Sequence, residues 1–178
     1  MSDAPAHLVE RAVPADAAAI AEFNRRLAWE TEGKTLDPDT VAAGVAAALA
    51  DPAKALYFVS RPVAPDPSAA GDAASGPAAG GVVPPAGCLM VTWEWSDWRN
   101  GAYWWIQSVY VRPESRGRGV FRGLLNAAAA AAAESGAVSL RLYAERENRL
   151  ARAVYARCGF SEPGYLLLEQ FPIRPASL

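Results

Sequence analysis

The segment 109–125 constrains the fold of this chain more than any other part of the sequence. It begins with the end of an apolar strand, stops at Pro113, turns through Arg-Gly-Arg-Gly and enters a helix near Phe121. Proline ends a strand because it cannot donate a hydrogen bond to the ladder. A strand that continues through a short turn into a helix is typical of sheets whose faces are covered by helices. The segment therefore favours an α/β fold.

Hydrophobic spacing elsewhere in the chain agrees with this fold class. Alternating or short buried apolar runs predict strands, whereas apolar residues three and four apart predict helices. The expected strands cover 7–13, 55–60, 88–95, 103–112, 139–144, a short piece at Phe160, and 165–171. The expected helices cover 16–30, 38–50, 121–135 and 148–157. This order predicts a mixed α/β sheet of about six to seven strands, flanked by about four helices.

A stretch of low complexity interrupts this pattern. In the segment 62–87, 21 of 26 residues are Pro, Gly, Ala or Ser. Such a composition cannot bury enough apolar surface to order itself. The chain of 178 residues is the size of one domain. We therefore expect a single domain spanning 1–178, with 62–87 as a flexible insertion on a surface turn.

Charge and composition exclude several classes of protein. The formal net charge is −2, so the chain has no overall basic field for nucleic acid. Its two cysteines and one histidine make neither a disulfide framework nor a typical zinc site, and we expect no metal. No apolar run reaches membrane-spanning length, and residues 1–6 carry no basic or apolar leader. We expect a cytoplasmic protein with no nucleic-acid or membrane partner.

The Arg/Gly turn has the chemistry of an anion site. Backbone N–H groups converge at the start of a helix, and the helix dipole favours negative charge there. Gly117 and Gly119 allow the backbone to approach a phosphate closely, and Arg116 and Arg118 can neutralise it. The turn has neither the Gly-Lys-Ser/Thr of a P-loop nor the spacing of a Rossmann fingerprint. Taken alone, it is equally compatible with an ordinary solvated turn.

A second segment raises the weight of the first. After the next predicted strand the chain reads Asn148-x-x-Ala151-x-x-x-Tyr155-x-x-x-Gly159-Phe160. Together the two segments resemble the GCN5-related N-acetyltransferase (GNAT) superfamily, whose loop follows the pattern Gln/Arg-x-x-Gly-x-Gly/Ala. Arg116 and Gly119 match this pattern, and Phe121 stands where the family usually has a small residue. The resemblance covers about 8–170 without the insertion.

The resemblance implies that acetyl-CoA binds where two parallel central strands, here 103–112 and 139–145, splay apart. Its pantetheine arm is then expected along the first strand, and its pyrophosphate on the turn. Asn148 is expected to contact the arm or an ordered water, and capping of its own helix is compatible with either. The residues that the resemblance assigns to the cofactor are Val109, Val111, Arg116, Gly117, Arg118, Gly119, Val120 and Asn148.

The resemblance also implies transfer of acetyl to an amine by direct attack in a ternary complex. Tyr155 matches the family's frequent general acid, which protonates the leaving thiolate. Several members carry a glutamate on the strand before the loop, where this chain has Gln107, which cannot take a proton. Glu94, between two tryptophans, is then the first candidate for the base, because burial there would raise its pKa.

The expected acceptor is a primary amine of a small molecule. A protein or peptide amine, and a non-catalytic acyl-CoA-binding module, stay as alternatives, and a homodimer is left open. Five of the six tryptophans fall within 93–105, where they line an acceptor pocket or pack as core. Acidic residues after the first helix would attract a cationic amine. The residues expected to contact the acceptor are Glu30, Glu32, Trp93, Trp105, Gln107 and Glu145.

Overall fold

The computed structural model describes residues 7–63 and 83–173, and the chain divides after Tyr143 into two compact units. Most of the predicted insertion, residues 64–82, lies outside the described residues. The flanking strands end at Pro62 and begin again at Gly87, which are the predicted limits of the insertion.

The first unit contains a five-stranded mixed sheet in the order β1-β2-β3-β4-β5. The strands are β1 (His7–Arg11), β2 (Leu56–Pro62), β3 (Gly87–Ser96), β4 (Gly101–Val111) and β5 (Ser139–Leu142). The first four pair antiparallel, and β5 pairs parallel to β4. The parallel pair is possible because a helix crosses over between β4 and β5. The predicted α/β class is confirmed.

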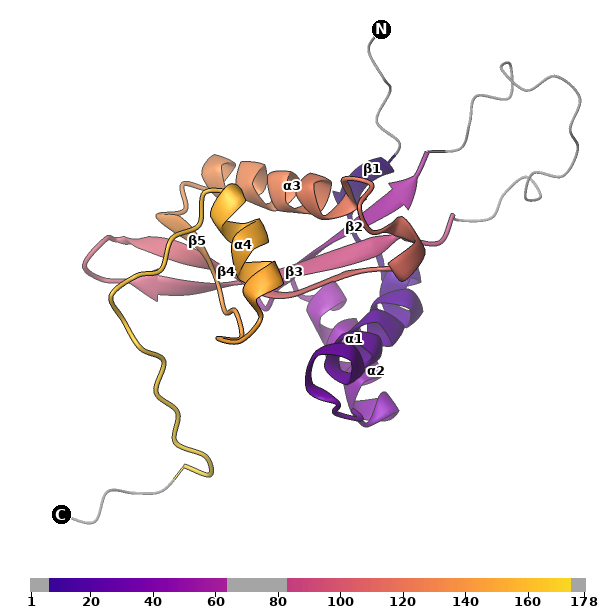
Figure 1. Cartoon of the computed structure of the whole chain (residues 1–178), viewed down its shortest axis with the longest axis horizontal. Coiled ribbons are helices and arrows are strands. Elements are labelled where there is room, and N and C mark those ends of the chain that lie inside the picture. Colours follow the sequence, from indigo (N-terminus) through magenta and orange to yellow (C-terminus); the bar gives the residue numbers. More distant parts are fainter. Residues whose placement is uncertain (1–6, 64–82, 174–178) are drawn as a thin grey trace, which may run out of the picture. The chain divides into compact units, whose positions relative to one another are not determined.

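Helices cover both faces of this sheet (Figure 1). On one face lie α1 (Ala17–Glu32) and α2 (Pro38–Ala50), and on the other lies α3 (Val120–Glu134). Asp37 begins α2 by accepting a hydrogen bond from the Thr40 N–H at 2.8 Å, as its position before Pro38 predicts. Small buried residues of α3, Ala128 and Ala132, let that helix pack closely on the sheet.

The core beneath α1 and α2 holds part of the site in place. Ile20 and Phe23 of α1 and Val45 of α2 are buried against the sheet. Among their partners is Tyr110 of β4, whose ring centroid lies 5.2 Å from that of Phe23. Burial of large apolar side chains contributes about 1.5–3 kcal/mol each. This packing fixes α1 relative to the last residues of β4.

The second unit contains α4 (Arg149–Arg157), and its remaining described residues form no strand. The strands expected at Phe160 and 165–171 are therefore wrong, and the sheet has five strands instead of six to seven. A strand needs a partner edge for its backbone hydrogen bonds. The segment 165–171 contains three consecutive leucines, 72–87% exposed, which do not alternate and so define no buried face.

Two further features bear on function. No helix within residues 7–63 and 83–173 is long and apolar enough to cross a bilayer. In the same residues, no group of three or more His, Cys, Asp or Glu side chains is placed to hold a metal ion.

Candidate functional site

The strand β4 extends beyond its pairing with β5. The parallel register runs from Tyr103 opposite Ser139 to Ile106 opposite Leu142, whereas β4 continues to Val111. Within the first unit, residues 108–111 are therefore paired on one edge, by β3, and open on the other, and Gln107 is paired with neither neighbouring strand. A strand edge of this kind presents N–H and C=O groups to an extended ligand.

The direction of the backbone groups on this open edge follows from the ladder with β3. Directly after β4, the Arg112 N–H donates to the Ala86 carbonyl at 2.9 Å, so the backbone groups of Arg112 point toward β3. Antiparallel pairs alternate between bonded and non-bonded. The N–H and C=O groups of Val109 and Val111 therefore point away from β3. In agreement, the Val111 carbonyl accepts a hydrogen bond from Arg116 Nε at 3.0 Å.

A β-bulge marks the start of the open edge. The register between β3 and β4 shifts between Met90 and Val91, which lie opposite Ser108 and Ile106. Gln107 is thus the extra residue of β4. Its side-chain amide donates to Thr92 Oγ1 at 2.8 Å. The bulge lies where pairing with β5 stops, so the two irregularities occur together.

The turn after β4 leads directly into α3. A short 3-10 helix covers Pro113–Ser115, and Gly119 is the N-cap of α3. Gly117 and Gly119 have φ of 75° and 83°, which only glycine adopts readily. A Cβ built on either glycine meets nothing within 4 Å. The turn therefore presents bare backbone at a helix N-terminus, where the first N–H groups have no partner within the helix.

One predicted amide does not belong to this set. The Arg116 N–H donates to the Pro113 carbonyl at 3.2 Å, so it is already used inside the 3-10 turn. The expectation that the Arg116 amide holds a phosphate is corrected on this point. The amide groups from Gly117 to Val120 keep the predicted assignment as a proposal.

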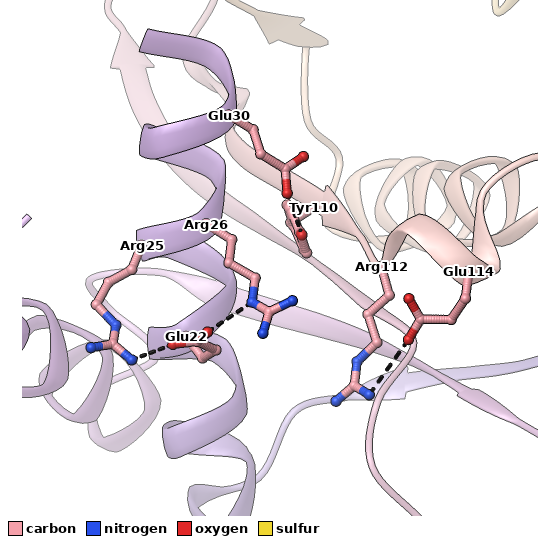
Figure 2. A network of polar contacts seen from close by, with 7 residues as sticks. All are labelled: Glu22, Arg25, Arg26, Glu30, Tyr110, Arg112 and Glu114. Atoms are coloured by element: carbon pink, nitrogen blue, oxygen red, sulfur yellow. Dashed lines mark hydrogen bonds and ion pairs between the residues drawn. The ribbon is translucent and has the colours of Figure 1, made fainter. Parts of the chain in front are cut away.

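The Arg116 side chain joins the turn to α1. Its guanidinium lies 2.6 Å from Glu30 Oε2, and Glu30 Oε1 accepts a hydrogen bond from the Tyr110 hydroxyl at 2.7 Å. Figure 2 shows the Glu30–Tyr110 contact and, beside it on α1, Glu22 paired with two arginines. Arg116 and Tyr110 hold the pKa of Glu30 below its usual value, in that order. Burial, and then Glu30, raises the pKa of Tyr110.

The contacts of Glu30 with Arg116 and Tyr110 change the roles expected for the loop arginines, Arg116 and Arg118. At neutral pH Glu30 is ionised and Tyr110 is protonated, so Glu30 balances the charge of Arg116. Within residues 7–63 and 83–173, Arg118 makes no hydrogen bond or ion pair and is exposed. Arg118 is therefore the loop cation whose charge is available to a bound anion. Glu30 holds the loop through Arg116. Because its charge is already balanced, it no longer attracts a cationic acceptor, which was the reason for its predicted role.

Three of the predicted site residues, Asn148, Tyr155 and Glu145, lie in the second unit. Asn148 Oδ1 accepts a hydrogen bond from the Ala151 N–H at 3.0 Å, so Asn148 caps α4. Tyr155 is half-buried, and its ring meets Phe160 edge-on at 5.9 Å between centroids. Burial raises the pKa of Tyr155. Glu145 is exposed, and its carbonyl accepts from the Asn148 N–H at 3.0 Å.

The expectations for the aromatic hairpin need two corrections. Trp93 lies opposite Trp104, whereas Trp105 lies opposite Thr92, so Trp93 and Trp105 lie on opposite faces of the sheet and cannot line one wall. Glu94 shares the face of Trp105 and accepts its indole N–H at 3.0 Å. Glu94 is exposed, so the burial that motivated its choice as base is absent.

Gln107 and Glu32, both predicted to contact the acceptor, line a cavity between α1, α2 and the sheet, and sequence reasoning missed the other residues around it. This cavity has a volume of about 560 Å³. Gln107 and Ser108 of the bulge line it, together with Asn24 of α1 and the ion pair of Glu32 with Lys34. Lining residues that sequence reasoning missed, among them Asn24, Val45, Tyr57 and Met90, come from α1, α2, β2 and β3, so no local spacing could have identified them as one set.

Comparisons with known proteins agree with this geometry. A model of the Acetyltransferase (GNAT) family matches residues 70–160. A crystal structure of a possible acetyltransferase from Clostridium difficile 630 has a TM-score of 0.77 and 36% identity, covering 94% of this chain and 99% of that chain.

Two more distant structures share the fold. Ribosomal-protein-alanine N-acetyltransferase from Brucella melitensis biovar Abortus 2308 has a TM-score of 0.65 and 17% identity, covering 93% of this chain and 100% of its own. Aminoglycoside N-acetyltransferase AAC(6')-Iy, in complex with CoA, has a TM-score of 0.70 and 13% identity, with coverages of 97% and 99%. No curated protein matches the chain. The family model spans half of the sequence and the Clostridium structure nearly all of it, and the chain belongs to the GNAT acetyltransferase family.

Proposed function

We propose that this protein transfers acetyl from acetyl-CoA to a primary amine of a small molecule. The observation that carries the proposal is the open edge of β4, which leads without interruption into the glycine turn at the N-terminus of α3. An extended amide-containing arm and a diphosphate are the two parts of CoA that such a strand edge and such a turn recognise.

The residues present fit this co-substrate. The outward N–H groups of Val109 and Val111 and the Val109 carbonyl match the amides of a pantetheine arm. The turn from Gly117 to Val120 supplies N–H groups for the pyrophosphate, and no Cβ of Gly117 or Gly119 stands in the way. Arg118 adds a positive charge. Asn148 is assigned to the arm in addition to its capping bond.

The chain's own acid–base groups supply the proton transfers. Acetyl-CoA supplies an activated thioester, whose C–S bond breaks as the amine nitrogen bonds to the carbonyl carbon. Tyr155 donates its phenolic proton to the departing sulfur, because its raised pKa keeps the phenol protonated. The amine nitrogen passes its proton through a water molecule to Glu94, the carboxylate that we assign as the base and that the Trp105 indole N–H positions.

Calorimetric titration of the protein with acetyl-CoA and with free CoA tests the cofactor site. We expect binding in the micromolar range for acetyl-CoA. Turnover is then measured as release of free thiol with DTNB in the presence of primary amines. Binding of acetyl-CoA without thiol release for any amine would favour the non-catalytic module. Absence of binding would contradict the proposed function.

Arg118→Ala is expected to weaken CoA binding about tenfold, because it removes one charge-assisted contact to phosphate. The loss should shrink as salt is raised, since exposed charge pairs are screened. Arg99→Ala is the control, because Arg99 is likewise exposed but lies in the turn between β3 and β4. Calorimetry with free CoA at two salt concentrations measures both variants. Equal affinities of the two variants would remove Arg118 from the site.

A further inference from the structure

The cavity under α1 and α2 begins at the bulge of β4. Gln107 and Ser108 line it, and they are also the first residues of β4 beyond the pairing with β5. The strand edge assigned above to acetyl-CoA and this cavity therefore start at the same two residues. A volume of about 560 Å³ lies within the range of small-molecule sites.

Apolar side chains form most of the wall of this cavity. They include Leu27 of α1, Val41 and Val45 of α2, and Met90 of β3. A wall of this kind binds the apolar body of a ligand by removing its surface from water. It gives no advantage to a ligand whose body is polar or charged along its length.

Two buried polar atoms of lining residues have no hydrogen-bond partner within residues 7–63 and 83–173. They are Asn24 Oδ1 and Ser108 Oγ. The Asn24 side-chain NH2 group donates to the Tyr57 hydroxyl at 3.4 Å, and this contact does not involve Asn24 Oδ1. Most buried polar groups in native proteins are satisfied, and those that are not call for a partner. Neither oxygen is exposed to the cavity, so a hydrogen-bond donor such as an amine reaches either atom only after its side chain turns toward the cavity.

The charges of the wall are already balanced. Among the described lining residues, Glu32 is the one carboxylate, and its Oε2 lies 2.5 Å from Lys34 Nζ. Glu30 is outside the lining and is bound by Arg116 and Tyr110. A polycation placed here would find no uncompensated carboxylate for its ammonium groups, and unpaired charges are costly to desolvate.

We propose that this cavity takes the acceptor, and that the acceptor is a primary monoamine with an arylalkyl or branched alkyl body. The inference rests on the function proposed above and deepens it by naming the class of acceptor. The apolar wall holds the body of the amine, and Asn24 and Ser108 turn their unpartnered oxygens toward its amino group. The balanced charges and the apolar wall favour such a monoamine over a polyamine or an aminoglycoside.

A panel of amines tests the class. The protein is assayed with acetyl-CoA and phenylethylamine, isoamylamine, spermidine or kanamycin, and thiol release is followed with DTNB. We expect kcat/KM for the two monoamines to exceed that for the two polycations at least about tenfold, since apolar pockets discriminate by that order. A preference for spermidine or kanamycin would overturn the inference, as would acetyl-CoA binding without turnover of either monoamine.

Two variants test the cavity itself. Gly44 lines the cavity, and a Cβ built on it meets nothing within 4 Å. Gly44→Phe should therefore fill free space and raise the KM of the monoamines at least about tenfold. Ala43→Phe, at an exposed position of α2 outside the lining, is the matched control. Asn24→Asp preserves shape but adds a carboxylate, and should shift the preference toward spermidine.

The outcomes separate this inference from the proposed function. Acetyl-CoA affinity, measured by calorimetry, should be the same in Gly44→Phe, Ala43→Phe and the unmodified protein. Unchanged monoamine KM in Gly44→Phe, or equal effects of Gly44→Phe and Ala43→Phe, would overturn the cavity assignment. No binding of acetyl-CoA by the unmodified protein would instead defeat the proposed function.

Discussion

Replacing Gly119 with aspartate is expected to weaken CoA binding at least about 100-fold, a loss of about 2.8 kcal/mol of binding free energy. Gly119 has φ of 83°, where an L-residue is strained. Its Cβ would also enter the empty space before the α3 N-terminus that we assign to the pyrophosphate. The new carboxylate would place negative charge against a diphosphate. Calorimetric titration with free CoA measures the loss.

The matched control for this variant lies at the other end of the same helix. Gly136 has φ of 72°, and a Cβ built on it also meets nothing within 4 Å. Gly136→Asp therefore brings the same backbone strain and the same charge away from the turn. We expect it to bind CoA with the affinity of the unmodified protein. It should lose more thermal stability than Gly119→Asp, because a carboxylate is favoured at a helix N-terminus and disfavoured at a helix C-terminus. Equal CoA affinities of the two variants would show that the turn is not the phosphate site.

Local spacing predicted the elements that local physics decides. Period-two runs gave the strand positions of the first unit within a few residues, and Asp37 with Pro38 predicted where α2 begins. The Arg/Gly turn was recognisable because positive φ at Gly117 and Gly119 needs glycine. In each case the deciding interaction lies within a few residues along the chain.

Features that depend on register could not be predicted in this way. Trp93 and Trp105 were expected on one acceptor wall, but the pairing of Trp93 with Trp104 puts them on opposite faces. Alternation says which residues of one strand share a face, and only the pairing says which face of the next strand they meet. The bulge at Gln107 adds one residue to the ladder and changes this relation again.

Long-range contacts were also out of reach. The ion pair of Arg116 with Glu30 joins residues 86 positions apart, and it changed the interpretation of both. From sequence alone, Arg116 was predicted to contact a phosphate and Glu30 a cationic acceptor, because each was considered as an exposed charge. The structure shows that the two charges balance each other. The charge that we propose for the phosphate is then that of Arg118, and the acceptor site that we propose is the cavity.

Tyr155→Phe is expected to lower kcat about 100-fold, the lower range of what a positioned general acid contributes. Phenylalanine keeps the edge-on contact with Phe160, so the variant should fold and should bind acetyl-CoA with unchanged affinity. Tyr165→Phe, at a residue that is 84% exposed in the same unit, is the control and should retain full turnover. Turnover is measured as thiol release under saturating acetyl-CoA.

The pH dependence of turnover gives a second test of Tyr155 with a definite sign. A general acid works in its protonated form, and burial raises the pKa of Tyr155 above the ordinary tyrosine value of about 10. The protonated fraction is therefore complete through neutral and mildly alkaline pH, and it falls only when pH rises past that value. The unmodified enzyme should show no alkaline loss of kcat from this group below about pH 10.

A loss of kcat between pH 7 and 9 that disappears in Tyr155→Phe would show a depressed pKa and contradict the burial argument. Unchanged kcat in Tyr155→Phe across the whole pH range would assign the protonation of the leaving sulfur to another group, because the substitution removes only the phenolic hydroxyl.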